Sequence, residues 1–431
     1  MKILLVMPHL RNKIKFPQLM VPPFPLQQLA GITPNEHSVT ILDERYQKLR
    51  INNDYDLVGI YCITYLAKRA YEIGDKFREI GVKTVLGGDH ASALPDEAKQ
   101  HADSVVIDES EQTWPKLLDD LKNNNLQPFY RQEIPIDGSL IPPAKRINNR
   151  FSSFIGSIQS SRGCPVGCEF CAVSNRVHGK IFRGRPIENV IEEIKSIKQK
   201  NLFFHNPTST ANVQYTKDLF RAMVGLNKKF MCYGNVNALV KDDELLKLAS
   251  EAGLTVWNVG LESISQDTIN SMGKRTNKVD DYKRAVKKIH DYNTRILGNF
   301  VFGFDNDKPD VFDKTLETAL DIDLDLSQFA ILTPFPGTPL FERLNREGRI
   351  LTKDWSRYTE ADVVFQPKNV TIDQLKNGTM NCLSEFYSAK NVYERFIKNK
   401  GVPLISSWKL SLDNKVYFKN RGMPTKSLKI Y

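Results

Sequence analysis

The sequence predicts an α/β protein: a flavodoxin-like, doubly wound parallel sheet, then a partial (βα)6 barrel and a mainly helical C-terminal region. Two patterns predict this fold. Short apolar runs, typical of strands, alternate with helical patterns over residues 1–125, and six further strand candidates follow after a linker. The composition, 41% hydrophobic and 26% charged over 431 residues, is that of a folded protein of two to three domains. We expect domains at 1–135, 148–345 and 346–431.

The first region has the pattern of a parallel sheet with helical crossovers. Its strand candidates are residues 3–7, 39–42, 57–63, 84–86 and 104–107. A helix between the third and fourth strands has one apolar stripe, formed by Leu66, Ala70, Ile73, Phe77 and Ile80. Another helix follows around residues 114–121. Strands that alternate with helices favour the doubly wound arrangement, in which ligands bind at the carboxyl ends of the strands.

Two of these strand ends are candidate ligand sites. Residues 61–64 close the third strand, and Gly87, Gly88, Asp89 and His90 follow the fourth. Paired glycines let a ligand approach the backbone closely. A simple tight turn is the alternative interpretation of the same glycine pair.

The second region follows a linker at residues 135–143. Its strand candidates are 154–158, 202–205, 230–233, 256–261, 298–302 and 328–333, and helical patterns separate most of them. Six βα units are too few for a closed eightfold barrel and predict an open one. In barrels of this kind, the chemistry takes place at the carboxyl ends of the strands.

A cysteine motif lies soon after the first barrel strand. Cys164, Cys168 and Cys171 have the spacing C-x3-C-x2-C, and three thiolates on one loop can bind three irons of a 4Fe–4S cluster. The fourth iron then stays open for a substrate or cofactor, as in catalytic metal sites. A zinc site that uses His178 as a fourth ligand is the alternative. The three remaining cysteines are isolated, which favours buried core thiols: Cys62, Cys232 and Cys382.

The motif, with Phe170 before its last cysteine, resembles that of the radical S-adenosylmethionine (SAM) enzymes. The resemblance implies that the open iron binds SAM and that reductive cleavage gives a 5′-deoxyadenosyl radical. Residues 260–263, 298–304 and 332–338 resemble later elements of that family. The SAM-binding residues implied are Phe170, Glu262, Ser263, Pro336 and Gly337; no catalytic side chain is assigned.

The N-terminal region is similar to the cobalamin-binding branch of that family. The resemblance lies in residues 86–95, 101–107 and 109–114, and residues 347–350 and 354–355 resemble the subgroup that includes hopanoid C-2 methylases. The cobalamin-binding residues implied are Thr64, Gly87, Gly88 and His90. Two features depart from the family: no histidine has the Asp-x-His-x-x-Gly pattern of an axial ligand, and His205-Asn206-Pro207 replaces the acidic residues common after the second barrel strand.

The resemblance implies a cobalamin-dependent methyltransferase that acts on a poorly activated carbon. A radical cyclase or rearrangement enzyme, and an iron–sulfur or corrinoid carrier, are the alternatives. We expect a small-molecule, lipid or peptide substrate, an electron donor such as flavodoxin or ferredoxin, and no nucleic acid. The short apolar run at residues 3–7 favours a cytoplasmic protein without a membrane span. The net charge is +10; ten Lys or Arg lie beyond residue 389, where only Glu394 and Asp413 oppose them. That tail is either a solvated face or a contact for an acidic partner.

Overall fold

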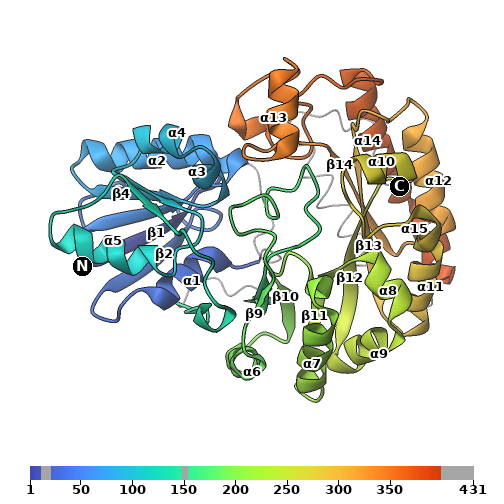
Figure 1. The fold of residues 1–431 in the computed structure, drawn as a ribbon, viewed down its shortest axis with the longest axis horizontal. Helices are drawn as coiled ribbons and strands as arrows, with labels where there is room; N and C mark the ends of the chain where they lie inside the picture. The colour runs from blue at the N-terminus through green and yellow to red at the C-terminus, as the bar shows by residue number, and fades with distance from the viewer. Residues whose placement is uncertain (11–20, 148–153, 399–431) are drawn as a thin grey trace.

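The protein contains two parallel sheets of six strands each, which lie next to one another along its long axis (Figure 1). The structure is a computed structural model that describes residues 1–10, 21–147 and 154–398. The N-terminal part of the chain forms the first sheet, and the central part forms the second. This arrangement confirms the predicted fold class.

The first sheet is doubly wound. Its strands, in the spatial order β2-β1-β3-β4-β5-β6, are β1 (Lys2–Met7), β2 (Ser38–Asp43), β3 (Leu57–Tyr61), β4 (Lys83–Gly87), β5 (Ser104–Ile107) and β6 (Phe129–Arg131). The helices are α1 (Phe24–Ile32), α2 (Ala67–Glu79), α3 (Asp89–Ala93), α4 (Pro95–Gln100) and α5 (Thr113–Lys122). Alternate residues of β1 enter different cores: Leu4 and Val6 pack with α2, whereas Ile3 and Leu5 pack with α1 and α5.

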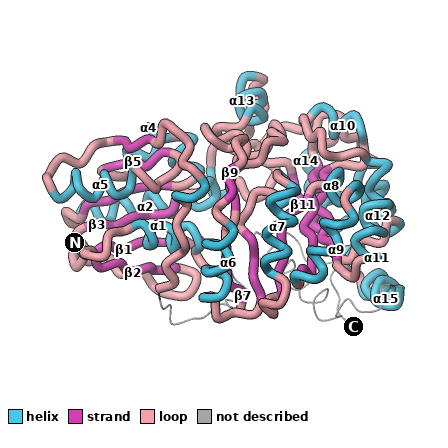
Figure 2. The backbone as a smooth tube through the Cα atoms, turned by 60° about the horizontal axis from the view of Figure 1, so that its bottom comes forward, coloured by secondary structure: helices cyan, strands magenta, loops and turns pink. Residues whose placement is uncertain are grey.

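The second sheet is an open barrel whose neighbouring strands follow one another along the chain. The strands are β7 (Ile155–Ile158), β10 (Asn201–Phe204), β11 (Lys229–Gly234), β12 (Leu254–Glu262), β13 (Arg295–Phe302) and β14 (Leu326–Ile331). The helices that follow them are α6 (Ile187–Ser196), α7 (Val213–Met223), α8 (Val236–Lys241), α9 (Asp243–Ala252), α10 (Gln266–Ser271), α11 (Tyr282–Asp291) and α12 (Val311–Asp321). A short hairpin of β8 (Ser161–Arg162) and β9 (Arg183–Gly184) encloses the cysteine motif. Figure 2 shows α7, α9 and α12 along the outside of this sheet.

Within the described residues, the C-terminal region is mainly helical and contacts both sheets. Helix α13 (Pro339–Arg346) leads into it, and it contains α14 (Ile372–Phe386) and α15 (Ala389–Lys398). Helix α14 packs on α12, where the Cys382 Sγ donates a hydrogen bond to the Phe312 carbonyl. Phe341, Trp355 and Tyr358 complete the core between α2 and the first sheet. The described residues of the C-terminal region therefore share the cores of both sheets and join them.

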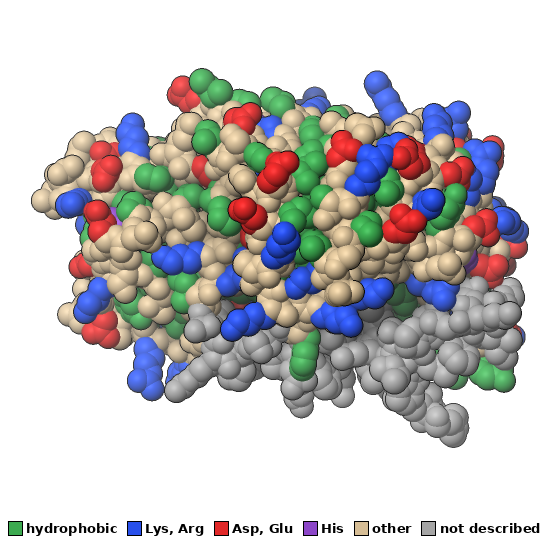
Figure 3. Space-filling model, turned by 90° about the horizontal axis from the view of Figure 1, so that it is seen from below, with side chains coloured by type: hydrophobic (Ala, Val, Ile, Leu, Met, Phe, Trp, Pro, Cys, Tyr) green, Lys and Arg blue, Asp and Glu red, His purple; other side chains and the backbone are tan. Residues whose placement is uncertain are grey.

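The described surface carries charges of both signs. Seen from below, Lys and Arg side chains are interspersed with Asp and Glu side chains (Figure 3). No helix in the described part of the chain combines the length and apolarity that a bilayer crossing requires. Most of the basic tail lies outside the described residues.

Candidate active site

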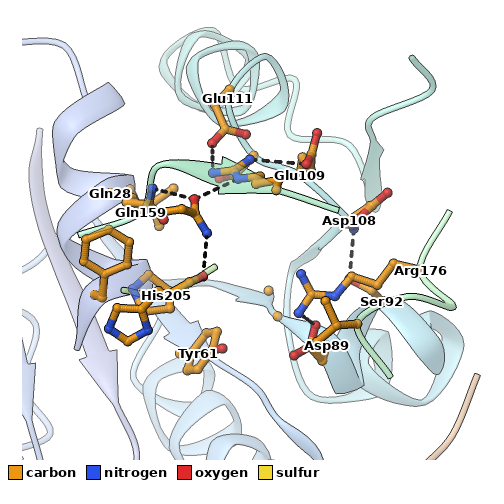
Figure 4. A pocket seen from close by; sticks show the side chains of 18 of the residues that line it. Gln28, Tyr61, Asp89, Ser92, Asp108, Glu109, Glu111, Gln159, Arg176 and His205 are labelled. Carbon is orange, nitrogen blue, oxygen red and sulfur yellow. Dashed lines mark hydrogen bonds and ion pairs between the residues drawn. The ribbon is translucent and has the colours of Figure 1, made fainter. Parts of the chain in front are cut away.

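A cavity of about 560 Å³ lies between the two sheets, at the carboxyl ends of strands from both. This size is within the range of small-molecule and cofactor sites, about 300–1,000 Å³. The first sheet contributes Tyr61, Gly87, Gly88 and Asp108, and the barrel contributes residues that include His205. Figure 4 shows side chains from both parts around this space. Both sheets thus place the ends of their strands at one shared site, as parallel sheets do.

The glycine pair after β4 keeps one wall of the cavity free of side chains. Gly88 has φ +120°, and a Cβ there would lie 2.8 Å from the Cys62 carbonyl oxygen and 3.0 Å from the Tyr61 ring. A Cβ at Gly87 would make only ordinary contact with Val106, at 3.7 Å. The space that a side chain at residue 87 would fill is therefore open, and the predicted close approach of a ligand to this backbone is sterically feasible.

The arginines of the cavity wall are bound to carboxylates. The Arg162 guanidinium donates to Glu111 Oε1 at 2.6 Å and lies 3.3 Å from Glu109 Oε1. Arg183 donates to the second oxygen of Glu109 at 2.6 Å, and Arg176 pairs with Asp89. Burial alone would raise the pKa of Glu109, but the hydrogen bond from Arg183 and the charge of Arg162 lower it.

Asp108, directly after β5, lines the cavity and has an unsatisfied carboxyl oxygen. Its Oδ2 is buried and has no hydrogen-bond partner, and its backbone is left-handed, with φ 68°. The backbone N–H donates to Ser92 Oγ at 2.9 Å (Figure 4). Burial raises the pKa of Asp108, and the neighbouring Glu109 charge raises it further. Glu111 also has a buried oxygen, Oε2, without a partner.

The barrel side of the cavity is aromatic. His205, directly after β10, stacks on Phe24 of α1, with ring centroids 4.7 Å apart. Its Nε2 lies 3.0 Å from Ser157 Oγ, and burial lowers its pKa to about 4, so the ring is neutral at pH 7. Gln159 connects the two parts: its Oε1 accepts from Gln28 of α1, and its Nε2 donates to the His205 carbonyl.

The residue after His205 has a structural function. The buried Asn206 accepts hydrogen bonds from the backbone N–H groups of Ser160 and Ser161, at 2.9 and 3.2 Å. These residues lead into the cysteine motif. Asn206 thus fixes the start of the cysteine loop. Its amide oxygen already accepts two backbone hydrogen bonds and is not free to bind a ligand.

The cysteine motif forms a tight loop closed by its own backbone. Gly163 and Gly167 both have positive φ, and a Cβ at Gly163 would lie 1.9 Å from the Ile181 carbonyl oxygen. The Cys164 N–H donates to the Gly179 carbonyl at 2.8 Å. Asn175 Nδ2 donates to the carbonyls of Cys168 and Cys171. This loop conformation depends on glycine at both positions.

The three thiols of this loop are partly or largely buried. They lie close enough to influence one another's ionisation, and burial raises the pKa of Cys164 and that of Cys168, the latter to about 12. Cluster binding must therefore release protons. In the described residues, no three His, Cys, Asp or Glu side chains converge as one metal ion requires, whereas a cubane binds each thiolate through a different iron. His178 Nε2 instead lies 3.3 Å from the Gln132 carbonyl oxygen, so the structure does not support the zinc alternative.

A buried ion pair lies next to the cysteine loop. Lys274 donates a hydrogen bond to Glu262, the last residue of β12, whose φ is 66°. The positive charge of Lys274 favours the thiolate forms of Cys164 and Cys168. Sequence reasoning selected Glu262 but missed Lys274, which lies in a loop without a motif.

The other residues predicted to bind SAM lie in the cysteine loop, after β12 and before α13. Phe170 packs edge-on against Phe304, and the Ser263 carbonyl accepts a hydrogen bond from Tyr282. Pro336 and Gly337 form the turn before α13, and a Cβ at Gly337 would lie 3.1 Å from Ala93 of α3. This turn thus contacts the first module.

Two residues predicted to bind cobalamin are not among the described residues that line the cavity. Thr64 is buried at the start of a short 3-10 turn, η2 (Thr64–Leu66). His90 is fully buried; its Nε2 lies 3.4 Å from Glu97 Oε1, and its ring packs against Trp355. We therefore assign Gly87 and Gly88, but not Thr64 or His90, to the cavity wall.

The fold and the site together define a radical SAM enzyme with a flavodoxin-like module in front of its barrel. The Radical SAM superfamily model matches residues 158–319, and a domain of unknown function, DUF4070, matches residues 338–402. Bacteriochlorophyllide d C-12(1)-methyltransferase of Chlorobaculum tepidum is 30% identical over 90% of this chain and 86% of its own. Hopanoid C-2 methylase of Rhodopseudomonas palustris is 25% identical over 87% of this chain and 73% of its own. The chain belongs to the radical SAM superfamily.

Two solved structures share the fold over nearly the whole chain. The methyltransferase TsrM from Kitasatospora setae, with cobalamin and a [4Fe-4S] cluster bound, has a TM-score of 0.70 at 16% identity, over 98% of this chain and 99% of its own. The cobalamin-dependent radical enzyme OxsB, with aqua-cobalamin and SAM bound, also has a TM-score of 0.70, at 15% identity, over 97% of this chain and 72% of its own. Both confirm the order of a doubly wound module and a partial barrel.

Proposed function

We propose that this protein is a cobalamin-dependent radical SAM methyltransferase that methylates a poorly activated carbon of a small molecule. One observation carries the proposal: the cavity that joins the carboxyl ends of both sheets, with Gly163 and Val173, which flank the cysteine motif, on the barrel side and the glycine pair on the module side. The methyltransferases among its relatives support the same activity.

The residues fit three cofactors. Cys164, Cys168 and Cys171 would hold a 4Fe–4S cluster. Residues around this loop would bind SAM: Phe170, Glu262, Ser263, Pro336 and Gly337. The open wall at Gly87 and Gly88 would hold the corrinoid. When bound, these groups supply a 5′-deoxyadenosyl radical, which takes a hydrogen atom from the substrate, and the methyl group that replaces it.

The chain's own residues would shield and position the reactants. The aromatic side chains of Phe24, Phe203, His205 and Tyr233 line the cavity and would limit the access of water to the substrate. The His205 ring is neutral, and the arginines of the wall are paired with carboxylates. The cavity wall therefore presents few unpaired charges to a radical. Exclusion of water and of side reactions is the protein's usual contribution to cofactor chemistry.

We also propose the domain functions, the electron donor and the compartment. Residues 1–135 would form the cobalamin module, 148–345 the radical domain and 346–431 an extension. A flavodoxin or ferredoxin would deliver the electron at the cysteine loop, where Pro165 and Lys180 are exposed. None of the six cysteines forms a disulfide, which supports a cytoplasmic location.

The test is an anaerobic turnover assay. Reconstituted enzyme is incubated with a reductant, SAM with a labelled methyl group, and candidate substrates that include tetrapyrroles and polycyclic lipids. Labelled product should appear with 5′-deoxyadenosine and S-adenosylhomocysteine in roughly equal amounts, because radical formation and cobalt remethylation each use one SAM. Deoxyadenosine without homocysteine co-product or label would favour the cyclase or rearrangement alternative. The absence of both co-products would favour a carrier.

A further inference from the structure

We infer that Asp108 is a ligand-binding residue whose Oδ2 accepts a hydrogen bond from an amide N–H group of the bound corrinoid. This inference rests on the proposed function, since it concerns the cofactor of the same site. Sequence reasoning assigned no function to Asp108.

The first observation is the unsatisfied oxygen. Asp108 Oδ2 is buried without a hydrogen-bond partner, at a residue that lines the cavity. A buried polar atom without a partner destabilises the folded protein unless a ligand or water satisfies it. A donor that enters the cavity would satisfy it.

The second observation is the backbone. Asp108 has φ 68°, a left-handed conformation that is uncommon for non-glycine residues, although aspartate adopts it more readily than most. The hydrogen bond from its N–H to Ser92 Oγ holds this conformation. Strained residues cluster at ligand sites, where the surrounding structure maintains them. Asp108 thus combines an unsatisfied buried oxygen with a left-handed backbone.

The charges of the wall indicate the chemistry of the ligand. Arg162, Arg176 and Arg183 are each paired with a carboxylate, so they are not free to bind an anion. The unsatisfied atoms of the carboxylates, Asp108 Oδ2 and Glu111 Oε2, are hydrogen-bond acceptors. The wall therefore suits a neutral ligand rich in N–H donors.

A corrinoid has this chemistry. Its rim carries neutral amide side chains, each with an NH₂ donor. Gly87, whose missing side chain leaves space for a ligand, pairs with Val106 in the adjacent strand, two residues before Asp108. A corrin ring against the glycine pair would thus bring its rim near Asp108.

The test compares Asp108→Gly with Asp323→Gly. Asp323 is the matched control, because it has a similar left-handed φ of 58° and lies after α12, away from the cavity. Glycine should relieve the strain at both positions. The Tm of the ligand-free Asp108→Gly variant should therefore stay unchanged or rise. Titration of hydroxocobalamin is followed by its visible absorption. The Kd should rise about 10-fold or more over that of the wild type in Asp108→Gly and stay unchanged in Asp323→Gly.

A second variant separates hydrogen bonding from charge. Asp108→Asn keeps an acceptor oxygen and should bind hydroxocobalamin within a few-fold of the wild type, whereas Asp108→Ala should bind as weakly as Asp108→Gly. Equal binding by the wild type, Asp108→Gly and Asp108→Ala would overturn the inference about Asp108 and leave the cobalamin assignment intact. No binding by the wild-type protein would overturn the cobalamin assignment itself, and the inference with it.

Discussion

The ammonium group of Lys274 donates a hydrogen bond to the Glu262 carboxylate, and both side chains are about nine-tenths buried next to the cysteine loop. A Cβ at Gly260 would lie 2.1 Å from Glu262 Oε1 and 2.5 Å from Lys274 Nζ, so the glycine of this strand end makes room for the ion pair. The pair therefore fixes the end of β12 and places a positive charge near the thiols.

Removal of one member of this pair should destabilise the protein. Glu262→Ala leaves the Lys274 charge buried without a partner, which should lower the free energy of unfolding by about 3 kcal/mol. Thermal and denaturant unfolding measure this loss. Glu244→Ala is the control, because Glu244 is half-exposed in its ion pairs and its loss should lower the free energy of unfolding far less.

Glu262→Ala should also reduce both SAM-derived co-products if Glu262 helps to hold the cofactor. Assays at a temperature where the variant stays folded separate this effect from the loss of stability. An unchanged yield of both co-products would remove Glu262 from the site.

The cluster should depend on the cysteine loop and on no other cysteine. Cys168→Ala should lose most of the iron, about four per chain by cubane stoichiometry, together with SAM cleavage. Cys382→Ala, in which a buried thiol outside the loop is removed, should keep the iron content. Iron and sulfide analysis with EPR of the reduced protein measures both variants. A normal cluster in Cys168→Ala would refute the assignment.

His205 should make the protein less stable in acid. Its folded pKa is about 4, below the ordinary value of 6.5, so the unfolded chain binds the proton more tightly. The neutral His205 ring makes its full contribution to the free energy of unfolding above pH 6.5. This contribution falls by up to about 3 kcal/mol as the pH falls from 6.5 towards 4. His205→Gln should flatten the pH dependence of the unfolding free energy in this window. An identical slope in the variant would contradict the prediction.

The contact between the C-terminal region and the module should contribute measurably to stability. Trp355 Nε1 donates to Glu97 Oε1 at 2.8 Å. Trp355→Phe removes this bond, whereas Trp257→Phe removes a buried Nε1 that has no partner. Both variants lose a similar side-chain volume. The free energy of unfolding should therefore fall further in Trp355→Phe than in Trp257→Phe, by about 1.5–3 kcal/mol, which is the contribution of a hydrogen bond to a charged group. Equal losses in urea unfolding would show that this bond is not stabilising.

The strands of both sheets could be predicted because their periodicity is strong. Residues 104–107 form β5 as predicted, and each of the other predicted strands overlaps a strand of the structure. Strand β6 was missed because it is short and only Tyr130 of it is buried. Helix α1, with its mixed Phe-Pro-Leu-Gln start, also lacked a clear apolar stripe.

The candidate site was only partly predictable. Cys164, Cys168 and Cys171 follow from spacing, because neighbours in sequence share one loop. Lys274 and Phe24 could not be found this way, since only the folded chain brings them to the cysteine loop and to the cavity. Asp108 could have been found, because it directly follows a predicted strand of a parallel sheet, where ligands bind.

The core that α2 shares with Phe341, Trp355 and Tyr358 limits how this protein can be recombined with its relatives. A chimera that exchanges residues 1–135 alone would pair a foreign module with the original residues 341–364. Those residues are matched to the core of the original module. Such a junction would mismatch buried side chains and leave apolar surface poorly covered. The inherited unit is therefore discontinuous: a viable graft of the module must carry the segment at 341–364 with it.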